Sequence, residues 1–311
     1  MRLVFAGTAE PSVPSLQRLL DSPHEVIAVV SRPDAPTGRG RKLAPSAIAT
    51  LARDRGIELL QPVRATDDDF KSRLTKLAPD CCPIVAYGAL IPPSLLRVPR
   101  YGWVNLHFSL LPAWRGAAPV QHAVLRGDEV TGASTFQLQE GLDTGPLFGT
   151  VTETIGPRDT SGDLLHRLAV SGAELLVQTL DGIESGELVP VAQVSDGVSL
   201  APKVTSDDSR LRWDSPSLHV DRQVRAFTPA PGAWTTFRNQ RVKILLAQRA
   251  DGDLDGTALK PGELAVTKSA VRVGTGSGAV LLGLVQPQGK RPMSATDWAR
   301  GLRITQGERL S

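Results

Sequence analysis

Short apolar runs alternate with segments of helical periodicity through the first half of the chain. The segment SAIATLARDRG, at 46–56, begins on a capping serine and ends on glycine, and TDDDFKSRLTKLA, at 66–78, has acidic residues in its first turn. Apolar strands separated by helices are typical of a mostly parallel sheet with helices on both faces, so the pattern predicts an α/β domain. The apolar runs are RLVFAG (2–7), EVIAVV (25–30), CCPIVAYG (81–88) and GWVNLHF (102–108).

The pattern changes in the second half. LFGTVTETI predicts a strand, and the segment at 159–186 predicts a long amphipathic helix. Residues 188–205 show little periodicity and several turn formers, which is typical of a linker. A single helical segment then precedes short β-rich runs separated by glycine and asparagine, which predict a small antiparallel barrel. We therefore expect three parts, at 1–187, 188–205 and 206–311.

Composition and charge narrow the class of protein. Hydrophobic residues make up 41% and charged residues 22% of the chain, so it can bury a sizeable core. No apolar run approaches the roughly 20 residues that span a bilayer. The N-terminus leads directly into a strand-like run, so we expect a cytoplasmic protein without membrane contact. The segment from Ser206 onward holds 16 Lys and Arg against 10 Asp and Glu. This basic third indicates either an anionic partner such as nucleic acid or a solvated, arginine-rich surface.

A Gly/Pro-rich segment at 31–46, SRPDAPTGRGRKLAPS, separates a strand from its helix by more than the usual connection. It carries Arg39, Arg41 and Lys42, with Asp34 as its one acidic residue. Two interpretations are open: a mobile insertion with solubilising charge, or an arm that contacts phosphates.

Polar side chains crowd the end of one predicted strand, in NLHFSLLPAWRGAAP at 105–119. Strand alternation places Asn105 and His107 on one face, and in an open parallel sheet the ligand crevice lies beyond the carboxyl ends of the strands. The pattern thus indicates a functional amide and imidazole, although a lone histidine at a strand end is also typical of a hydrogen-bonded core residue.

A carboxylate follows in GLDTGP, where Asp143 lies in a turn between two glycines. Asp143 can form an Asx-turn, or it can join Asn105 and His107 at one edge of the sheet. In the second case the three fit acyl transfer. Asn105 and a charged His107 would donate to the oxyanion of a tetrahedral intermediate, and Asp143 would keep the imidazole charged and oriented.

Other catalytic signals are weak. The chain has no G-x-S-x-G elbow and no paired metal-ligand spacing, so we expect no metal. Cys81 and Cys82 are adjacent in an apolar run. This is typical of small buried residues, and a redox pair or metal site is the alternative.

Four central motifs are Asn105-x-His107, SLLP (109–112), WRGAAP (114–119) and GLDTG (141–145). Together they resemble the folate-dependent formyltransferases. Four further motifs follow the order of that family: FAGT near the start, GRGRKL in the 31–46 segment, VAYG and RAFTPAPGAW. The resemblance therefore covers nearly the whole chain, and within the family it is closest to members that act on aminoacylated tRNA.

The resemblance implies a Rossmann-like catalytic domain followed by a small, OB-like β-barrel that helps to hold tRNA. It implies that 10-formyltetrahydrofolate donates a formyl group to the α-amine of methionine on initiator tRNA. We expect the protein to act as a monomer. The implied catalytic residues are Asn105, His107 and Asp143. The implied folate contacts are Ser109, Leu110, Leu111 and Pro112. The implied tRNA contacts are Arg39, Arg41 and Lys42.

Three alternatives stay open. A formyltransferase acting on a glycinamide ribonucleotide or an amino sugar would keep the three polar residues but would not need the basic segments. A non-catalytic RNA-binding protein would leave the three residues without a purpose. A dinucleotide oxidoreductase would need G-x-G-x-x-G after the first strand, where the chain has GTAEPS. The chain also departs from the family at Phe108, where glycine is usual, and at Ala230, often a tryptophan.

Overall fold

The computed structural model describes residues 1–37, 42–250, 259–305 and 307–311. By its internal contacts the chain forms two compact units, and each is described by itself. The first unit comprises residues 1–119, 130–154 and 165–201. The second unit comprises residues 120–129, 155–164 and 202–311.

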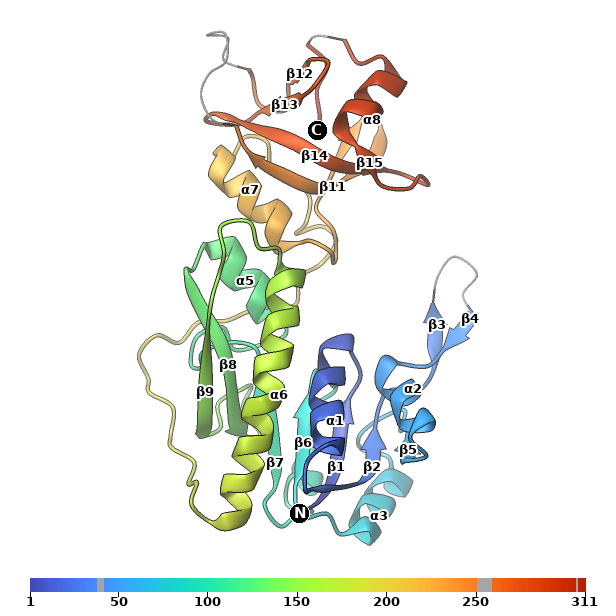
Figure 1. Cartoon of the computed structure of the whole chain (residues 1–311), viewed down its shortest axis with the longest axis vertical. Helices are drawn as coiled ribbons and strands as arrows, with labels where there is room; N and C mark the ends of the chain where they lie inside the picture. Colours follow the sequence, from blue (N-terminus) through green and yellow to red (C-terminus); the bar gives the residue numbers. More distant parts are fainter. Residues whose placement is uncertain (38–41, 251–258, 306) are drawn as a thin grey trace. The chain divides into compact units, whose positions relative to one another are not determined.

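The first unit is built on a seven-stranded sheet with the order β5-β2-β1-β6-β7-β8-β9 (Figure 1). Neighbouring strands are parallel from β5 to β7, whereas β8 and β9 are antiparallel. This confirms the predicted mostly parallel α/β sheet. The strands are β1 (Arg2–Gly7), β2 (Glu25–Val30), β5 (Glu58–Leu60), β6 (Cys82–Val85), β7 (Trp103–His107), β8 (Val130–Gln137) and β9 (Leu147–Thr154).

Helices cover both faces of this sheet (Figure 1). On one face α1 and α6 are joined by an ion pair, with 2.8 Å between Arg18 Nε and Glu174 Oε2. On the same face Leu106 of β7 packs against Gly172 of α6, where a Cβ atom would lie 3.0 Å from the leucine side chain. The helices of the first unit are α1 (Val13–Leu20), α2 (Ala47–Asp54), α3 (Asp68–Leu77), α4 (Pro93–Leu96) and most of α6 (Ser161–Ser185), with a 3₁₀ turn at Glu10–Ser12. All but the first residue of α5 (Pro119–Arg126) belongs to the second unit.

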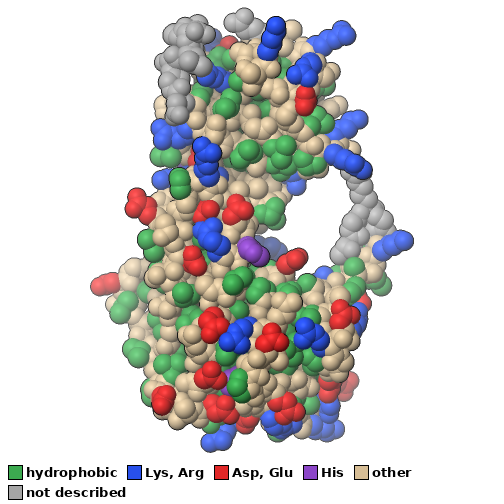
Figure 2. Space-filling model, viewed as in Figure 1, with side chains coloured by type: hydrophobic (Ala, Val, Ile, Leu, Met, Phe, Trp, Pro, Cys, Tyr) green, Lys and Arg blue, Asp and Glu red, His purple; other side chains and the backbone are tan. Residues whose placement is uncertain are grey.

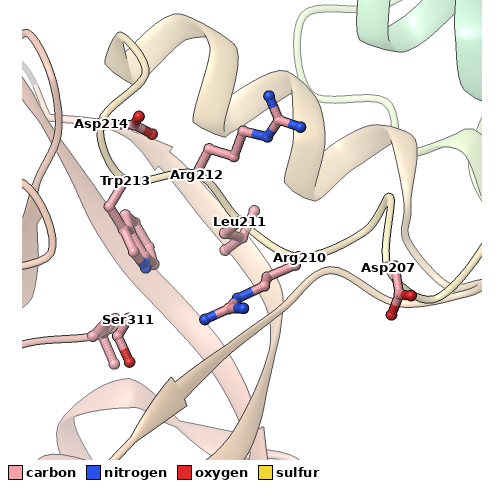
Figure 3. A pocket seen from close by; sticks show the side chains of 8 residues that line it. Asp207, Arg210, Leu211, Arg212, Trp213, Asp214 and Ser311 are labelled. Atoms are coloured by element: carbon pink, nitrogen blue, oxygen red, sulfur yellow. The ribbon is translucent and has the colours of Figure 1, made fainter.

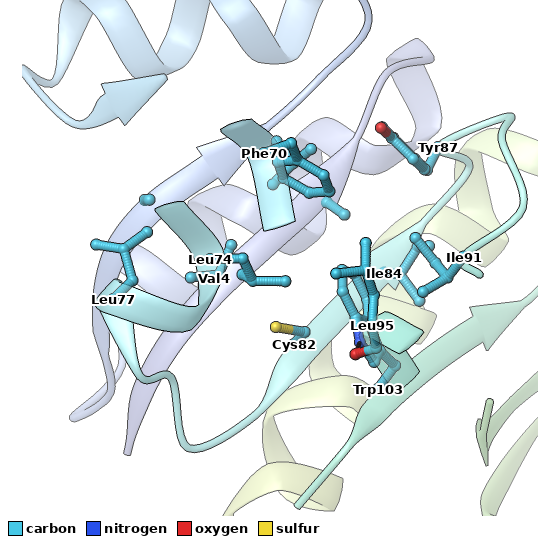
Figure 4. Packing of buried hydrophobic residues seen from close by; sticks show 13 residues of the cluster. Val4, Phe70, Leu74, Leu77, Cys82, Ile84, Tyr87, Ile91, Leu95 and Trp103 are labelled. Carbon is cyan, nitrogen blue, oxygen red and sulfur yellow. Dashed lines mark hydrogen bonds between the residues drawn. The ribbon is translucent and has the colours of Figure 1, made fainter. Parts of the chain in front are cut away.

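The opposite face holds the apolar cluster drawn in Figure 4, which joins the sheet to α3 and α4. Leu74 of α3 and Trp103 of β7 are fully buried in it. The indole of Trp103 donates a hydrogen bond of 2.9 Å to the carbonyl oxygen of Leu95 in α4. Because side chains alternate along a strand, Asn105 and His107 share the face of Trp103 and lie on the side of the sheet away from α6.

The segment predicted as a linker has no helix, but part of it follows the first unit closely. Residues 191–201, here called the strap, begin where the backbones of Val191 and Leu147 exchange hydrogen bonds of 2.7 and 2.8 Å. Near its other end Leu200 forms a parallel bridge with Arg115. The strap is therefore fixed to the loop that follows β7.

The Gly/Pro-rich segment at 31–46 contains two short strands that pair antiparallel, β3 (Ala35–Thr37) and β4 (Lys42–Ala44). The helix after it, α2, begins as predicted: the Ser46 side chain accepts a hydrogen bond from the backbone N–H of Ala49.

The second unit contains an antiparallel sheet of six strands: β10-β11-β14-β13-β12 in order, with β15 paired to β14 (Figure 1). The sheet forms a half-barrel, which agrees with the predicted small antiparallel barrel. Phe237 and Trp298 meet edge to face under it, with ring centroids 5.2 Å apart. The elements are α7 (Ser217–Ala226), β10 (Trp234–Phe237), β11 (Gln240–Arg249), β12 (Leu264–Val266), β13 (Val271–Gly274), β14 (Ala279–Pro287), β15 (Met293–Ser294) and α8 (Ala295–Leu302).

Among the residues that the structure describes, no helix combines the length and the apolar character needed to cross a membrane.

Candidate active site

Strand β7 delivers two of the predicted catalytic side chains to the carboxyl end of the sheet. Asn105 is half-buried, whereas His107 is only 7% exposed. The side-chain amide of Asn105 makes no hydrogen bond to any part of the chain that the structure describes. Its donors are therefore available to a ligand, as an oxyanion-binding role requires.

The imidazole of His107 has a defined tautomer. Its Nε2 atom lies 2.9 Å from the carbonyl oxygen of Trp114, which can only accept, so Nε2 carries a proton and donates. Its Nδ1 atom faces the carboxylate of Asp143, with 3.8 Å between Nδ1 and Oδ2. The structure thus brings His107 and Asp143 together, although they are far apart in sequence.

The protonation of His107 differs from the expectation drawn from the sequence. Burial of the ring lowers the pKa of His107 below its usual value, and this outweighs the opposing effects of the Asp143 charge and the Trp114 carbonyl. Asp143 thus favours the charged imidazole, as the sequence suggested, but burial opposes it and favours the neutral ring. In the neutral ring with a proton on Nε2, Nδ1 is a proton acceptor.

Backbone geometry holds Asp143 in place. The residue has a φ of +51°, a left-handed conformation that aspartate tolerates better than most residues. Its Oδ2 atom accepts a hydrogen bond of 2.7 Å from the backbone N–H of Gly116. Gly116 has a φ of +127°. A Cβ atom there would lie 2.6 Å from the carbonyl oxygen of Ala201, so only glycine fits between Asp143 and the strap.

Two residues of the strap reach this site, and no sequence pattern points to either of them. The Gln193 side chain donates hydrogen bonds of 2.8 Å to the carbonyl oxygens of Asp143 and Gly145. The hydroxyl oxygen of Ser199 accepts a hydrogen bond of 2.9 Å from the backbone N–H of Trp114. Polar residues in a segment without periodicity are ordinary, so only the fold reveals these contacts.

The SLLP stretch forms a tight turn immediately after His107. Ser109 is fully buried, and its hydroxyl donates a hydrogen bond of 2.6 Å to the carbonyl oxygen of Ala113. The hydroxyl of Ser134 in β8 donates to the Ser109 carbonyl over 2.7 Å and accepts the N–H of Leu111 over 3.1 Å. Leu111 is buried, whereas Leu110 and Pro112 are half-buried. In this structure Ser109 shapes the turn, and a folate contact of the four residues stays a prediction.

The predicted tRNA contacts are only partly described. Lys42 lies in β4 with an exposed side chain. Arg39 and Arg41 lie outside the described residues.

The two cysteines are buried and free. Burial raises the pKa of Cys81 to about 12 and raises that of Cys82 well above its usual value. Neither thiol is therefore suited to nucleophilic or redox chemistry at neutral pH.

Within the described ranges there is also no group of three or more His, Cys, Asp or Glu side chains that could hold a metal ion.

The second unit presents a basic and aromatic surface. Figure 2 shows Lys and Arg side chains spread over its visible face. The guanidinium groups of Arg210 and Arg241 lie 5.5 Å and 4.0 Å from the ring centroid of Trp234. Arg210 also lines a cavity of about 390 Å³, whose lining side chains are drawn in Figure 3. The cavity is lined by Asp207, Arg210, Leu211, Arg212, Trp213, Asp214, Leu310 and Ser311.

Comparison with known proteins places this fold and site in one class of enzymes. The formyl transferase family model matches residues 1–180, and the model of the formyl transferase C-terminal domain matches residues 203–303. The chain therefore belongs to the formyl transferase family. This leaves the dinucleotide oxidoreductase alternative without support.

The sequences of curated relatives match this chain over its full length. The chain is 62% identical over 310 residues to a methionyl-tRNA formyltransferase of Thermobifida fusca, covering 100% of this chain and 99% of that protein. It is 61% identical over 311 residues to a protein of the same name from Streptomyces coelicolor, with 100% and 99% covered. A solved N-formyltransferase of Helicobacter canadensis, in complex with folinic acid and dTDP-3-aminofucose, shares the fold with a TM-score of 0.67 at 16% identity. The match covers 92% of this chain and 98% of that one.

Proposed function

We propose that this protein transfers the formyl group of 10-formyltetrahydrofolate to the α-amine of methionine on initiator tRNA. The observation that carries the proposal is the 3.8 Å approach of His107 and Asp143 at the carboxyl end of β7, with Asn105 on the same face of that strand. It occurs in a chain that matches methionyl-tRNA formyltransferases over its whole length. The resemblance noted in the sequence implies the same donor and acceptor.

The three residues can carry out the chemistry as follows. The amine nitrogen attacks the formyl carbon, a C–N bond forms, and the carbonyl electrons move onto the oxygen. The free amide donors of Asn105 stabilise that oxyanion. Nδ1 of His107 accepts the proton that the amine loses. The proton then passes to N10 of tetrahydrofolate as the bond between N10 and the formyl carbon breaks. The carboxylate of Asp143, 3.8 Å away, stabilises the imidazolium formed between these steps.

The remaining assignments belong to the same proposal. Ser109 to Pro112 form one wall of the folate site, in which Leu110 and Pro112 supply accessible apolar surface. Arg39, Arg41 and Lys42 contact phosphates of the acceptor stem. The second unit adds a basic surface in which guanidinium groups flank Trp234, a combination that suits RNA. We further propose that the catalytic, linker and barrel parts end near residues 187, 205 and 311, and that the protein acts as a cytoplasmic monomer.

The test is formylation by the purified protein. With 10-formyltetrahydrofolate as donor, we expect N-formylmethionyl ester on charged initiator tRNA and much less product on charged elongator methionine tRNA. A dTDP-amino sugar serves as the competing acceptor. Formylation of the sugar nucleotide with none of the tRNA would overturn the proposal in favour of a small-substrate formyltransferase.

A further inference from the structure

We infer that Gln193 of the strap is a positioning residue for formyl transfer: its side-chain amide sets the place of Asp143 and of the loop that bonds His107. This inference rests on the proposed function, because it assigns a role to Gln193 in that reaction.

One side chain bridges both halves of the site. Nε2 of Gln193 donates to the carbonyl oxygens of Asp143 and Gly145, each over 2.8 Å. Oε1 of the same amide accepts from the guanidinium of Arg115, over 2.6 Å from Nη2 and 3.2 Å from Nε. Carboxylates can only accept and ammonium groups can only donate, so an amide is needed to satisfy all three partners.

Arg115 connects this bridge to the catalytic pair. It lies between Trp114, whose carbonyl oxygen accepts from His107, and Gly116, whose N–H donates to Asp143. Gln193 therefore fixes the Asp143 turn from one side and the 114–116 loop from the other. A shift of the Asp143 turn or of the 114–116 loop changes the 3.8 Å separation of His107 Nδ1 and Asp143 Oδ2.

The strap depends on such hydrogen bonds because most of its apolar side chains are exposed, with Ala201 at its end as the buried exception. Val191, Val194 and Leu200 are 69%, 64% and 64% exposed, whereas the polar Gln193 and Ser199 are half-buried. Little apolar surface is buried between the strap and the loops, so little hydrophobic energy holds them together. The position of the strap against the loops is therefore set by the hydrogen bonds of Gln193, of Ser199 and of the backbone.

The hydrogen bonds of Gln193 also help to hold a left-handed aspartate in the turn. Asp143 has a φ of +51°, and a Cβ atom on Gly145 would lie 1.7 Å from the carbonyl oxygen of Gln137. The turn is therefore pressed against β8 on one side and held by Gln193 on the other. Without the two hydrogen bonds from Gln193 the turn has room to relax away from His107.

The experiment compares Gln193→Ala and Gln193→Glu with the parent in the full-length protein. Glutamate has almost the shape of glutamine and keeps the partner of Arg115, but it cannot donate to the carbonyl oxygens of Asp143 and Gly145. We expect both variants to lower kcat by about tenfold to a hundredfold, the scale of a 1 Å misplacement of catalytic groups. The KM values for tRNA and folate should change much less.

A second readout separates positioning from general structure. The acid limb of the pH profile of kcat/KM should move to lower pH in Gln193→Ala, because a displaced Asp143 supports the protonated ring of His107 less well. Val194→Ala, at a neighbouring and exposed strap position, is the matched control and should leave kcat and the pH profile unchanged.

The outcomes are distinct. A parent that formylates tRNA, with Gln193 variants that keep its kcat and pH profile, overturns the inference alone. Equal losses in the Gln193 variants and in Val194→Ala also overturn it, because any disturbance of the strap would then suffice. A parent that is folded but formylates no acceptor overturns the proposed function and, with it, the inference.

Discussion

The Oδ2 atom of Asp143 accepts a hydrogen bond of 2.7 Å from the backbone of Gly116, while the same atom lies 3.8 Å from Nδ1 of His107. The carboxylate is thus fixed by the backbone and is close enough to act on the imidazole electrostatically. It is too far away to take the proton directly. In the proposed reaction Asp143 therefore stabilises charge on the imidazole, and Nδ1 of His107 accepts the proton of the substrate amine.

Removing a member of the catalytic set should abolish most turnover without unfolding the protein. We expect Asn105→Ala, His107→Ala and Asp143→Ala each to lower kcat by about a hundredfold or more, the usual scale for loss of an oxyanion-type donor. Steady-state kinetics and far-UV circular dichroism check this. His166→Ala, on an exposed histidine of α6, is the matched control.

These residues should also act as a unit. Double variants are expected to lose far less than the product of the single losses, because each single change already disables the common step. Multiplicative losses across a double-mutant cycle would contradict the shared mechanism.

The pH dependence follows from the lowered pKa of His107. The neutral ring is the active form, so activity is lost as pH falls through the pKa of the folded protein. The acid limb of kcat/KM should therefore lie below the ordinary histidine value of about 6.5. Asp143→Asn removes the charge that opposes the shift and should move the limb further down. Rate measurements across pH with one substrate compare the two proteins directly, and an unchanged limb in Asp143→Asn would argue against His107 as the base.

Gly116 should tolerate no side chain. Gly116→Ala places a Cβ atom 2.6 Å from the Ala201 carbonyl oxygen at a φ of +127°, so the 114–116 loop or the strap must shift. We expect a loss of about 1–3 kcal/mol in unfolding free energy, the usual cost of a strained backbone position. Turnover should fall as well.

Denaturant unfolding measures the effect of Gly116→Ala. The control is Gly301→Ala in α8, where an added Cβ meets nothing within 4 Å. It should be neutral or stabilising by about 0.5–1 kcal/mol. Equal stability of Gly116→Ala and the parent would mean that the strap is not held as described.

A reduced folate should stabilise the protein in the absence of tRNA, because the proposed folate wall at Ser109–Pro112 lies in the first unit. Binding to the native state alone adds about 2.7 kcal/mol at a ligand concentration one hundred times Kd. Thermal unfolding with and without folinic acid measures the shift. A melting temperature that does not change at saturating ligand would count against this wall as the folate site.

The basic residues of the 31–46 segment should affect tRNA and not folate. Replacing Arg39, Arg41 or Lys42 by alanine should raise the KM for charged tRNA. Each change should flatten the slope of log K against log salt by about 0.7–0.9, the contribution of one phosphate contact. The KM for the folate donor should stay the same.

A salt titration of the three variants beside the parent tests this prediction. Lys71→Ala, at an exposed lysine of α3, removes the same charge elsewhere on the first unit. If the three variants match Lys71→Ala in affinity and slope, the segment is a solvated insertion and tRNA is held by other groups.

Much of this protein could be predicted from local pattern. The apolar runs at 2–7, 25–30, 81–88 and 102–108 correspond to β1, β2, β6 and β7. Such runs are informative because strands buried on both faces must be continuously apolar. Asn105, His107 and Asp143 could be predicted as site residues from their positions. Polar side chains at strand ends and in glycine turns cost folding free energy unless they form hydrogen bonds or serve a function.

Tertiary structure alone decided how those groups interact. The spacing of His107 and Asp143 in sequence says nothing of the 3.8 Å between their side chains. The lowered pKa of His107 depends on burial by residues distant in the chain, and this burial opposes the charge that was expected on the ring. Gln193 and Ser199 lie in a segment without periodicity, where no local rule distinguishes a structural contact from a solvated side chain. Their roles exist only because the fold returns the strap to the loop after β7, and hydrogen bonds across such distances leave no pattern in the sequence.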